Sequence, residues 1–257
     1  MNARKWVAAA TTAAGLALAA EAGAVPVGLE LMLLVDTSGS IDATEYQLQK
    51  TGYVQAFQSA AVQNAILANP TGGIAVTYIE WSGAAEQSVR VGWTLVDSAA
   101  AANAFAAAIN ATTRLFGGQT GIQAAMDTQY PGFGTETGGT SNGFESPRQV
   151  IDISGDGADN DSPLSLLPSG GRDNALAAGV DAVNGIAILG EGGLAAYYQA
   201  NVVGGTGSFY AEASSFADFA TAIERKLERE ITGVPEPATL GLLAAGLVGA
   251  AWRRRRG

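Results

Sequence analysis

The chain has 257 residues, enough for one α/β domain with a sizeable core and short appendages. It contains neither cysteine nor histidine, which excludes disulfides, thiolate or imidazole metal ligands, and hydrolases of the Ser-His type. The formal charge is −10, but the ends at 4–5 and 253–256 hold six of the 14 basic residues, and Glu21 is one of the 24 acidic ones. The remainder carries 8 positive and 23 negative groups, or −15. Such a surface repels phosphates and attracts cations, so we expect no nucleic acid partner.

Residues 1–24 have the features of a secretory signal peptide. Arg4 and Lys5 form the positive start, residues 6–20 form an apolar segment, and small residues flank two candidate cleavage sites at 20–24. The alternative is an uncleaved N-terminal anchor, but the apolar segment is short for a membrane span. We therefore expect an exported protein.

An apolar run then ends abruptly in polar residues. Residues 29–35 read as a strand buried on both faces, which is typical of a parallel sheet, and Asp36-Thr37-Ser38-Gly39-Ser40 follows. In an open α/β sheet, ligands lie just beyond the carboxyl ends of the strands. Asp36, Ser38 and Ser40 offer one carboxylate and two hydroxyls there. Hard oxygen ligands of this kind suit Mg²⁺ or Mn²⁺, and in a looser arrangement Ca²⁺.

The patterns of apolar residues and turn residues predict the other elements. Helices are expected over 42–67, 98–109, 122–129, 172–180, 194–203 and 215–231, and strands over 74–81, 87–96, 149–154, 183–189 and 208–212. Strand 87–96 follows a short turn and alternates as a hairpin partner should. The expected fold is a doubly wound α/β domain: a mostly parallel six-stranded sheet with one antiparallel edge strand and helices on both faces.

Four local features carry expectations of their own. The segment 131–147, rich in Gly, Thr and Ser, reads as a surface loop or disordered insertion. Ser215 to Asp218 matches a capping box that would open the last helix. Asp159 and Asp161 read as solvated turn residues rather than a second cation site. The remaining feature is a run of charged residues expected on the solvated face of the last helix: Glu224, Arg225, Lys226, Glu228, Arg229 and Glu230.

Two later loops can add oxygen ligands. Thr120 lies just before helix 122–129, where alone it reads as an ordinary N-cap, and Asp156 follows strand 149–154 at the edge that carries Asp36. Convergence of the loops would assemble five oxygen ligands, three of them neutral hydroxyls, from Asp36, Ser38, Ser40, Thr120 and Asp156. A cation held in this way keeps positive charge and an open position for an acidic group of a partner. We expect binding rather than catalysis, because no tuned base or nucleophile stands nearby.

The C-terminal end has three consecutive parts. Pro235, Glu236 and Pro237 precede an apolar segment at 238–252, and the cluster Arg253, Arg254, Arg255 and Arg256 follows. The apolar segment would be about 22 Å long as a helix, short of a bilayer core of about 30 Å. Trp252 and snorkelling arginines would extend it, with the arginines on the cytoplasmic side and the folded body outside.

These motifs resemble two known families. Asp36-Thr37-Ser38-Gly39-Ser40, with Thr120 and Asp156, resembles the metal-ion-dependent adhesion site (MIDAS) of von Willebrand factor A-type (VWA) domains. Residues 29–231 more specifically resemble an uncharacterised bacterial branch of that family, through motifs such as Glu80-Trp81-Ser82-Gly83 and the sequence at 150–157. The resemblance implies a divalent cation, with Mg²⁺ expected and Ca²⁺ or Mn²⁺ as alternatives.

The tail is similar to the PEP-CTERM sorting signal. That resemblance implies processing by an exosortase-type enzyme, a membrane-anchored precursor, and delivery to the surface of a Gram-negative bacterium. We thus expect a signal peptide at 1–24, a VWA-like domain at 25–232 and the sorting signal at 233–257. The leading hypothesis is a surface or matrix binding protein that grips a carboxylate of a protein or polymer; the alternatives are a metal-assisted hydrolase acting on phosphoesters and a matrix protein whose metal only stabilises the fold.

Overall fold

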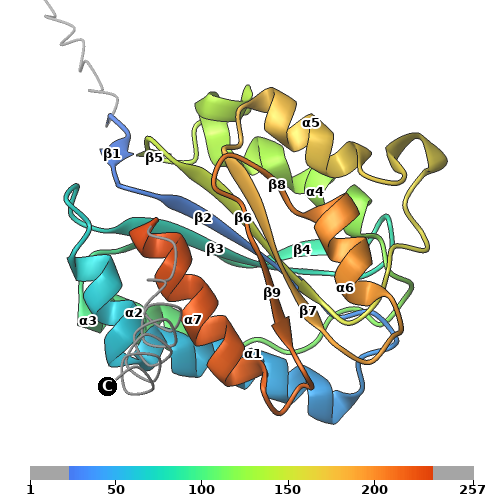
Figure 1. Ribbon diagram of the computed structural model, residues 1–257. Helices are drawn as coiled ribbons and strands as arrows, with labels where there is room; N and C mark the ends of the chain where they lie inside the picture. The colour runs from blue at the N-terminus through green and yellow to red at the C-terminus, as the bar shows by residue number, and fades with distance from the viewer. Residues whose placement is uncertain (1–22, 234–257) are drawn as a thin grey trace, which may run out of the picture.

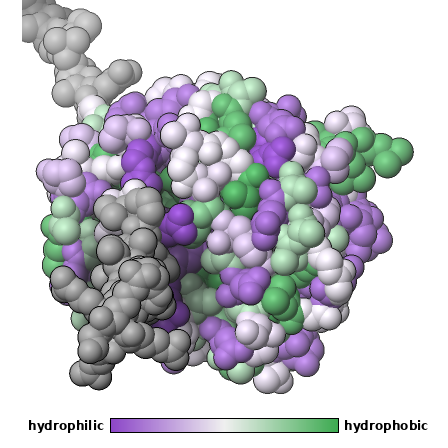
Figure 2. Space-filling view, viewed as in Figure 1, coloured by the Kyte–Doolittle hydropathy of each residue, from purple (hydrophilic) through white to green (hydrophobic). Residues whose placement is uncertain are grey.

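The computed structural model describes residues 23–233, so the expected signal peptide, sorting motif, apolar tail and arginine cluster lie outside the described residues, apart from 23–24. A central sheet is sandwiched between two helical layers (Figure 1). Helices α1, α2, α3 and α7 cover one face, and α4, α5 and α6 cover the other. The visible surface is mainly hydrophilic, interrupted by small hydrophobic areas (Figure 2).

The main sheet has the strand order β4-β3-β2-β6-β7-β8, with β9 also paired to β7. Pairs β3–β4 and β7–β8 are antiparallel, and the other pairs in this sheet are parallel. The strands are β1 (Val25–Pro26), β2 (Glu30–Asp36), β3 (Ile74–Trp81), β4 (Gln87–Val96), β5 (Phe144–Glu145), β6 (Gln149–Gly155), β7 (Ala182–Ile188), β8 (Gly204–Gly205) and β9 (Tyr210–Ala213). The predicted fold class is confirmed: the six expected strands form this sheet, and the two-residue β8 joins as a seventh.

The helices follow the expected order. They are α1 (Ala43–Gln58), α2 (Ala60–Leu67), α3 (Ala99–Asn110), α4 (Ile122–Gln129), η1 (Tyr130–Thr137), η2 (Leu164–Leu166), α5 (Gly170–Ala178), α6 (Leu194–Tyr197), η3 (Tyr198–Val202) and α7 (Phe219–Thr232). The helix predicted over 42–67 is two helices, because Ser59 is extended and its hydroxyl accepts the Val62 N–H. Asp42 and Glu45 form a complete capping box at the start of α1.

Strand β2 shows why the chain forms a two-sided core. Successive side chains of a strand point to opposite faces of the sheet. Leu31, Leu33 and Val35 pack into the cluster under α1, α2, α3 and α7, whereas Met32 and Leu34 pack into the cluster under α4, α5 and α6. A strand buried on both sides needs apolar residues at consecutive positions, which is the pattern that the sequence shows.

The segment 131–147 lies mostly at the surface, as expected, but it is ordered, so its assignment as a possible disordered insertion was wrong. It contains most of η1 and all of β5, which pairs with β1 in a small separate sheet. Phe133 is fully buried, with its ring centroid 5.5 Å from that of Trp93. Asn142 Nδ2 donates to Glu30 Oε1 at 2.5 Å. One buried aromatic ring and one amide thus anchor a segment whose composition is that of a loop.

Two expectations for the last helix were also wrong. Helix α7 begins at Phe219 rather than near Ser215, whose hydroxyl donates to Asp218 Oδ2 in a turn that precedes the helix. Lys226 and Glu230 do not line a solvated face, because both side chains are fully buried. Both turn inward to polar partners on the sheet, so their charge did not predict their exposure.

Candidate metal centre

Loops distant in the sequence meet beyond the carboxyl ends of β2 and β6. Ser40 Oγ donates a hydrogen bond to Asp156 Oδ1 at 2.6 Å, and Ser38 Oγ lies 3.1 Å from Ser40 Oγ. Thr120 lines the same cavity as Ser40 and Asp156. The volume of this cavity is about 510 Å³. Asp36 is the last residue of β2 and comes just before Ser38 and Ser40 in the chain. The structure therefore brings the hydroxyl and carboxylate oxygens of these loops to one edge of the sheet.

The Asp36 carboxylate is fully buried, and its two oxygens differ in their hydrogen bonding. Its Oδ1 accepts the Ser38 N–H at 2.7 Å, which fixes the turn after β2. Its Oδ2 is buried and has no hydrogen-bond partner among residues 23–233. Burial raises the pKa of Asp36 to about 7. A buried carboxylate oxygen without a donor is costly, so the donor set fits a cation at this position.

Gly155 is required next to Asp36 because the space is filled. A Cβ atom on Gly155 would lie 2.7 Å from Asp36 Oδ2 and 2.7 Å from the Tyr198 hydroxyl. Backbone from β6 thus approaches Asp36 more closely than any side chain would permit. The glycine allows the ends of β2 and β6 to present Asp36 and Asp156 together.

Asp156 lies in a negative environment. Burial raises its pKa, and the charges of Glu45 and Glu191 act in the same direction, while the bond from Ser40 opposes them. Glu191 also lines the cavity, where its Oε2 accepts the Ala158 N–H at 3.3 Å. A cation bound here would relieve this repulsion.

Thr120 is fixed to the Asp156 loop through its backbone. Its N–H donates to Asn160 Oδ1 at 2.9 Å, and its carbonyl accepts the N–H groups of Asn160 and Asp161. Thr120 is 5% exposed, and the N-cap of α4 is Gly121 rather than Thr120. The simple N-cap interpretation of Thr120 therefore does not hold, and its hydroxyl faces the loop near Gly157.

Asp159 and Asp161 are structural rather than solvated, contrary to the sequence-based interpretation. Asp159 accepts hydrogen bonds from the Gln123 N–H at 2.7 Å and from the Ser162 hydroxyl at 2.7 Å. Asp161 Oδ2 accepts the Ala84 N–H at 2.8 Å. The two carboxylates fasten the Asp156 loop to the start of α4 and to the turn between β3 and β4.

Arg114 is a contributor that the sequence did not suggest. Its Nη2 donates to the carbonyls of Thr37 and Ser38 at 2.9 and 2.7 Å, and Gly39 N–H donates to the Gly118 carbonyl at 2.7 Å. These bonds attach the loop after β2 to the segment 114–118. The partners lie 76 and 77 positions apart, so no local pattern could reveal them.

The candidate centre differs from carboxylate-rich metal sites. Within residues 23–233, no group of three or more His, Cys, Asp or Glu side chains is arranged to hold a metal ion. The candidate ligands are two carboxylates and three hydroxyls. Such a set leaves the net charge on a divalent cation less neutralised than three carboxylates would.

Similar solved structures define the fold as the von Willebrand factor A type. One is proximal thread matrix protein 1 from the mussel byssus with a zinc-occupied MIDAS motif (TM-score 0.58, 16% identity, 81% of this chain and 49% of that chain). Another is the von Willebrand factor type A protein from Catenulispora acidiphila (TM-score 0.52, 13% identity, 80% and 43%). A further one is the pilus adhesin SpaC from Lactobacillus rhamnosus GG (TM-score 0.57, 15% identity, 80% and 31%). The chain therefore spans about half, or less, of these proteins.

The family follows from the sequence itself. The chain belongs to the family described as "Protein of unknown function (DUF1194)", whose model matches residues 26–235. The PEP-CTERM protein-sorting motif matches residues 233–256, which confirms the predicted sorting signal. No curated protein sequence matches the chain. None of the helices within residues 23–233 is long and apolar enough to cross a bilayer, and the apolar segment at 238–252 lies outside that range.

Proposed function

We propose that this protein is an exported, surface-associated binding protein that holds a divalent cation with Asp36, Ser38, Ser40, Thr120 and Asp156. Mg²⁺ is the expected ion, with Ca²⁺ or Mn²⁺ as alternatives. Through the cation the protein would grip a carboxylate of a protein or polymer partner. The observation that carries the proposal is the 2.6 Å contact between Ser40 Oγ and Asp156 Oδ1, which joins two of the loops that would share the ion.

Each residue has a distinct role in this proposal. Ser38, Ser40 and Thr120 supply neutral hydroxyl oxygens, and Asp36 and Asp156 supply the negative charge. Asp36 also orders the loop through its bond to the Ser38 N–H. When bound, the cation would supply an electrophilic position for an anionic group of a partner. The sequence has no histidine or cysteine to add a base or nucleophile, so the chemistry favours binding over catalysis.

The comparisons support an extracellular role without defining the partner. One neighbour in fold, a byssal thread matrix protein, has zinc at a MIDAS motif, and another is a pilus adhesin. The sorting motif supports processing by an exosortase-type enzyme, from a precursor anchored through the C-terminal segment. The proposed location is the cell surface or extracellular matrix of a Gram-negative bacterium.

Polymer binding tests the proposal. The full chain is immobilised, and retention of polyglutamate and of a carboxylated polysaccharide is measured with Mg²⁺ and then with EDTA. We expect retention that EDTA abolishes and that Ser40→Ala lacks, while the remote Ser215→Ala retains it. Retention that is unchanged by EDTA would contradict the proposal. A melting temperature that EDTA lowers, with polymer retention unaffected, would instead indicate a purely stabilising metal. Phosphoester hydrolysis lost with EDTA would indicate a hydrolase.

A further inference from the structure

A second cluster of ionisable groups lies between the sheet and α7. Lys226 Nζ lies 2.6 Å from Asp152 Oδ1 on β6 and 2.5 Å from Glu230 Oε1 one turn further along α7. All three side chains are 0% exposed. Asn184 Nδ2 donates to Glu230 Oε1 at 2.9 Å and so orients that carboxyl group. The cluster contains one amine and two carboxyl groups that are closed off from water.

The Asp152 carboxyl group is poorly satisfied as an ion. Neither of its oxygens has a hydrogen bond of normal geometry within the described part of the chain, although Nζ is close. Glu230 Oε2 is likewise without a partner there. Burial, and then the charge of Asp152, raise the pKa of Glu230, so this carboxyl group tends to hold a proton. A buried ion pair with so few donors carries a large desolvation cost, which loss of both charges would remove.

We propose that Lys226 and Asp152 are a self-modification site, at which the chain forms an amide bond between Lys226 Nζ and Asp152 Cγ. The amine first gives a proton to the Asp152 carboxylate, which leaves both groups neutral. Nζ then attacks Cγ, the bond from Cγ to its hydroxyl oxygen breaks, and a second proton passes from Nζ through Glu230 to the departing hydroxyl. One ammonium and one carboxylate become one amide and one water, so atoms and charge balance.

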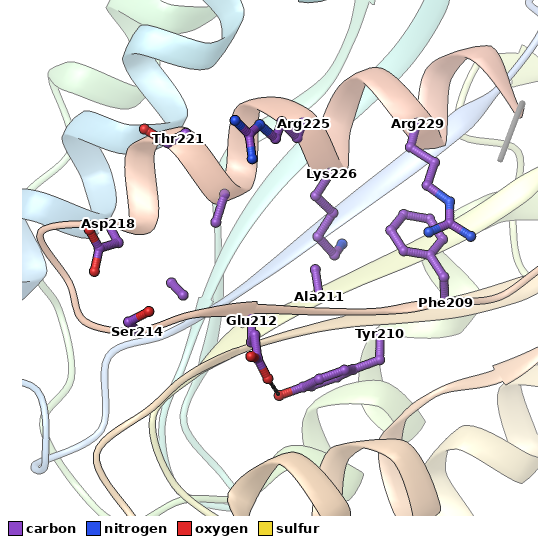
Figure 3. Close-up of a pocket in the computed structure, with 12 residues that line it drawn as sticks. Phe209, Tyr210, Ala211, Glu212, Ser214, Asp218, Thr221, Arg225, Lys226 and Arg229 are labelled. Carbon is purple, nitrogen blue, oxygen red and sulfur yellow. Dashed lines mark hydrogen bonds between the residues drawn. The ribbon is translucent and has the colours of Figure 1, made fainter. Parts of the chain in front are cut away.

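The surroundings suit this condensation. Lys226, Phe209 and Ala211 are among the residues that line a cavity of about 500 Å³ between β9 and α7, so there is space beside the cluster for the released water. Figure 3 shows the Lys226 side chain pointing from α7 toward the strand that carries Ala211. The bond would tie the centre of the sheet to the last helix before the sorting motif. An exported chain without cysteine has no disulfide available for this purpose.

Mass spectrometry of the purified full chain tests the bond. We expect the folded protein to be lighter than its processed sequence by one water, and a tryptic digest to contain the peptides of residues 152 and 226 joined together. Asp152→Asn should give the same amide with loss of ammonia. Lys226→Arg keeps the positive charge but should remain at full mass, and Glu230→Gln should form the amide much more slowly. Arg225→Lys, which places an amine at a neighbouring exposed position, should add no further link.

If a variant fails to fold, the mass and the tryptic peptides of the wild-type protein are sufficient to test the proposed amide bond. Folded wild-type protein at full mass, with the two peptides separate, would overturn the proposal and leave an ordinary buried ion-pair network. This readout requires no metal and no partner, so it is independent of the proposed binding function.

Discussion

Ser40 Oγ and Asp156 Oδ1 lie 2.6 Å apart although 116 positions separate the two residues in the chain. The contact exists because β2 and β6 are parallel neighbours whose carboxyl ends finish at the same level, with Val35 opposite Ser154. The loops that follow must then emerge together. Two oxygens at this distance form a charge-assisted hydrogen bond, and a cation bound by both oxygens could take the place of that bond.

Ser40→Ala should weaken cation binding with little effect on the fold. Changes in the groups that merely orient metal ligands typically cost 10- to 100-fold in affinity, so loss of a ligand should cost at least about tenfold. Binding of Mg²⁺ is measured by calorimetry, alongside far-UV circular dichroism. Ser215→Ala is the matched control. Equal affinity in both variants would remove Ser40 from the site.

Asp159→Ala should destabilise the protein, because the N–H of Gln123 and the hydroxyl of Ser162 would lose their acceptor. Unpaired buried donors and lost caps cost about 1–3 kcal/mol each. Urea unfolding measures the loss, and Asp97→Ala, at an exposed position, should change it by no more than about 0.5 kcal/mol. Cation affinity should also fall, because the loop of Asp156 would loosen. A variant as stable as wild type would show that Asp159 is merely solvated.

Stability should fall as the pH rises through the titration of Glu30. Burial raises the pKa of Glu30 from 4.5 to about 7, although Asn142 and Ser146 donate to its oxygens. The folded protein then binds this proton more tightly than the unfolded chain. The resulting stabilisation is fully present below pH 4.5 and is lost as the pH rises through about 7.

The variant Glu30→Gln isolates this effect. Its amide can still accept from Asn142 but does not titrate. The free energy of unfolding, measured in urea at pH 5 and pH 8, should fall in the wild type by about 1–3 kcal/mol more than in the variant. Parallel pH profiles for the two proteins would rule out Glu30 as a source of the dependence.

Phe133→Ala should show that the segment 131–147 is part of the fold. Removing a fully buried aromatic ring costs about 3–5 kcal/mol, and the contact with Trp93 would be lost as well. Leu164→Ala is the comparison, since Leu164 is 88% exposed and should change stability by no more than about 0.5 kcal/mol. Similar unfolding curves for both variants would contradict the anchoring role.

The predictable parts of this protein are those in which adjacent residues carry the information. The apolar run of β2, the antiparallel hairpin partner β4 and the capping box at Asp42 each follow from local spacing, and each is present in the structure. Asp36, Ser38 and Ser40 could be placed at the sheet edge because they follow a strand directly. Asp156 could be placed there for the same reason.

The unpredicted parts depend on partners distant in sequence. Arg114, Asp159 and Lys226 are all charged, and charge usually indicates exposure. Their roles arise from backbone carbonyls, helix N–H groups and a carboxylate that only folding brings near. Such contacts depend on how distant segments pack against one another in the folded chain, and no window of sequence around any of the three residues contains that information.

Calorimetric titration of Mg²⁺ into the purified full chain tests the central claim most directly. The account predicts one binding site per chain with measurable heat, and its loss in Asp156→Asn, which keeps the shape of the side chain but removes its charge. Absence of binding heat for Mg²⁺, Ca²⁺ and Mn²⁺ in the folded wild-type protein, or equal binding by Asp156→Asn, would contradict it.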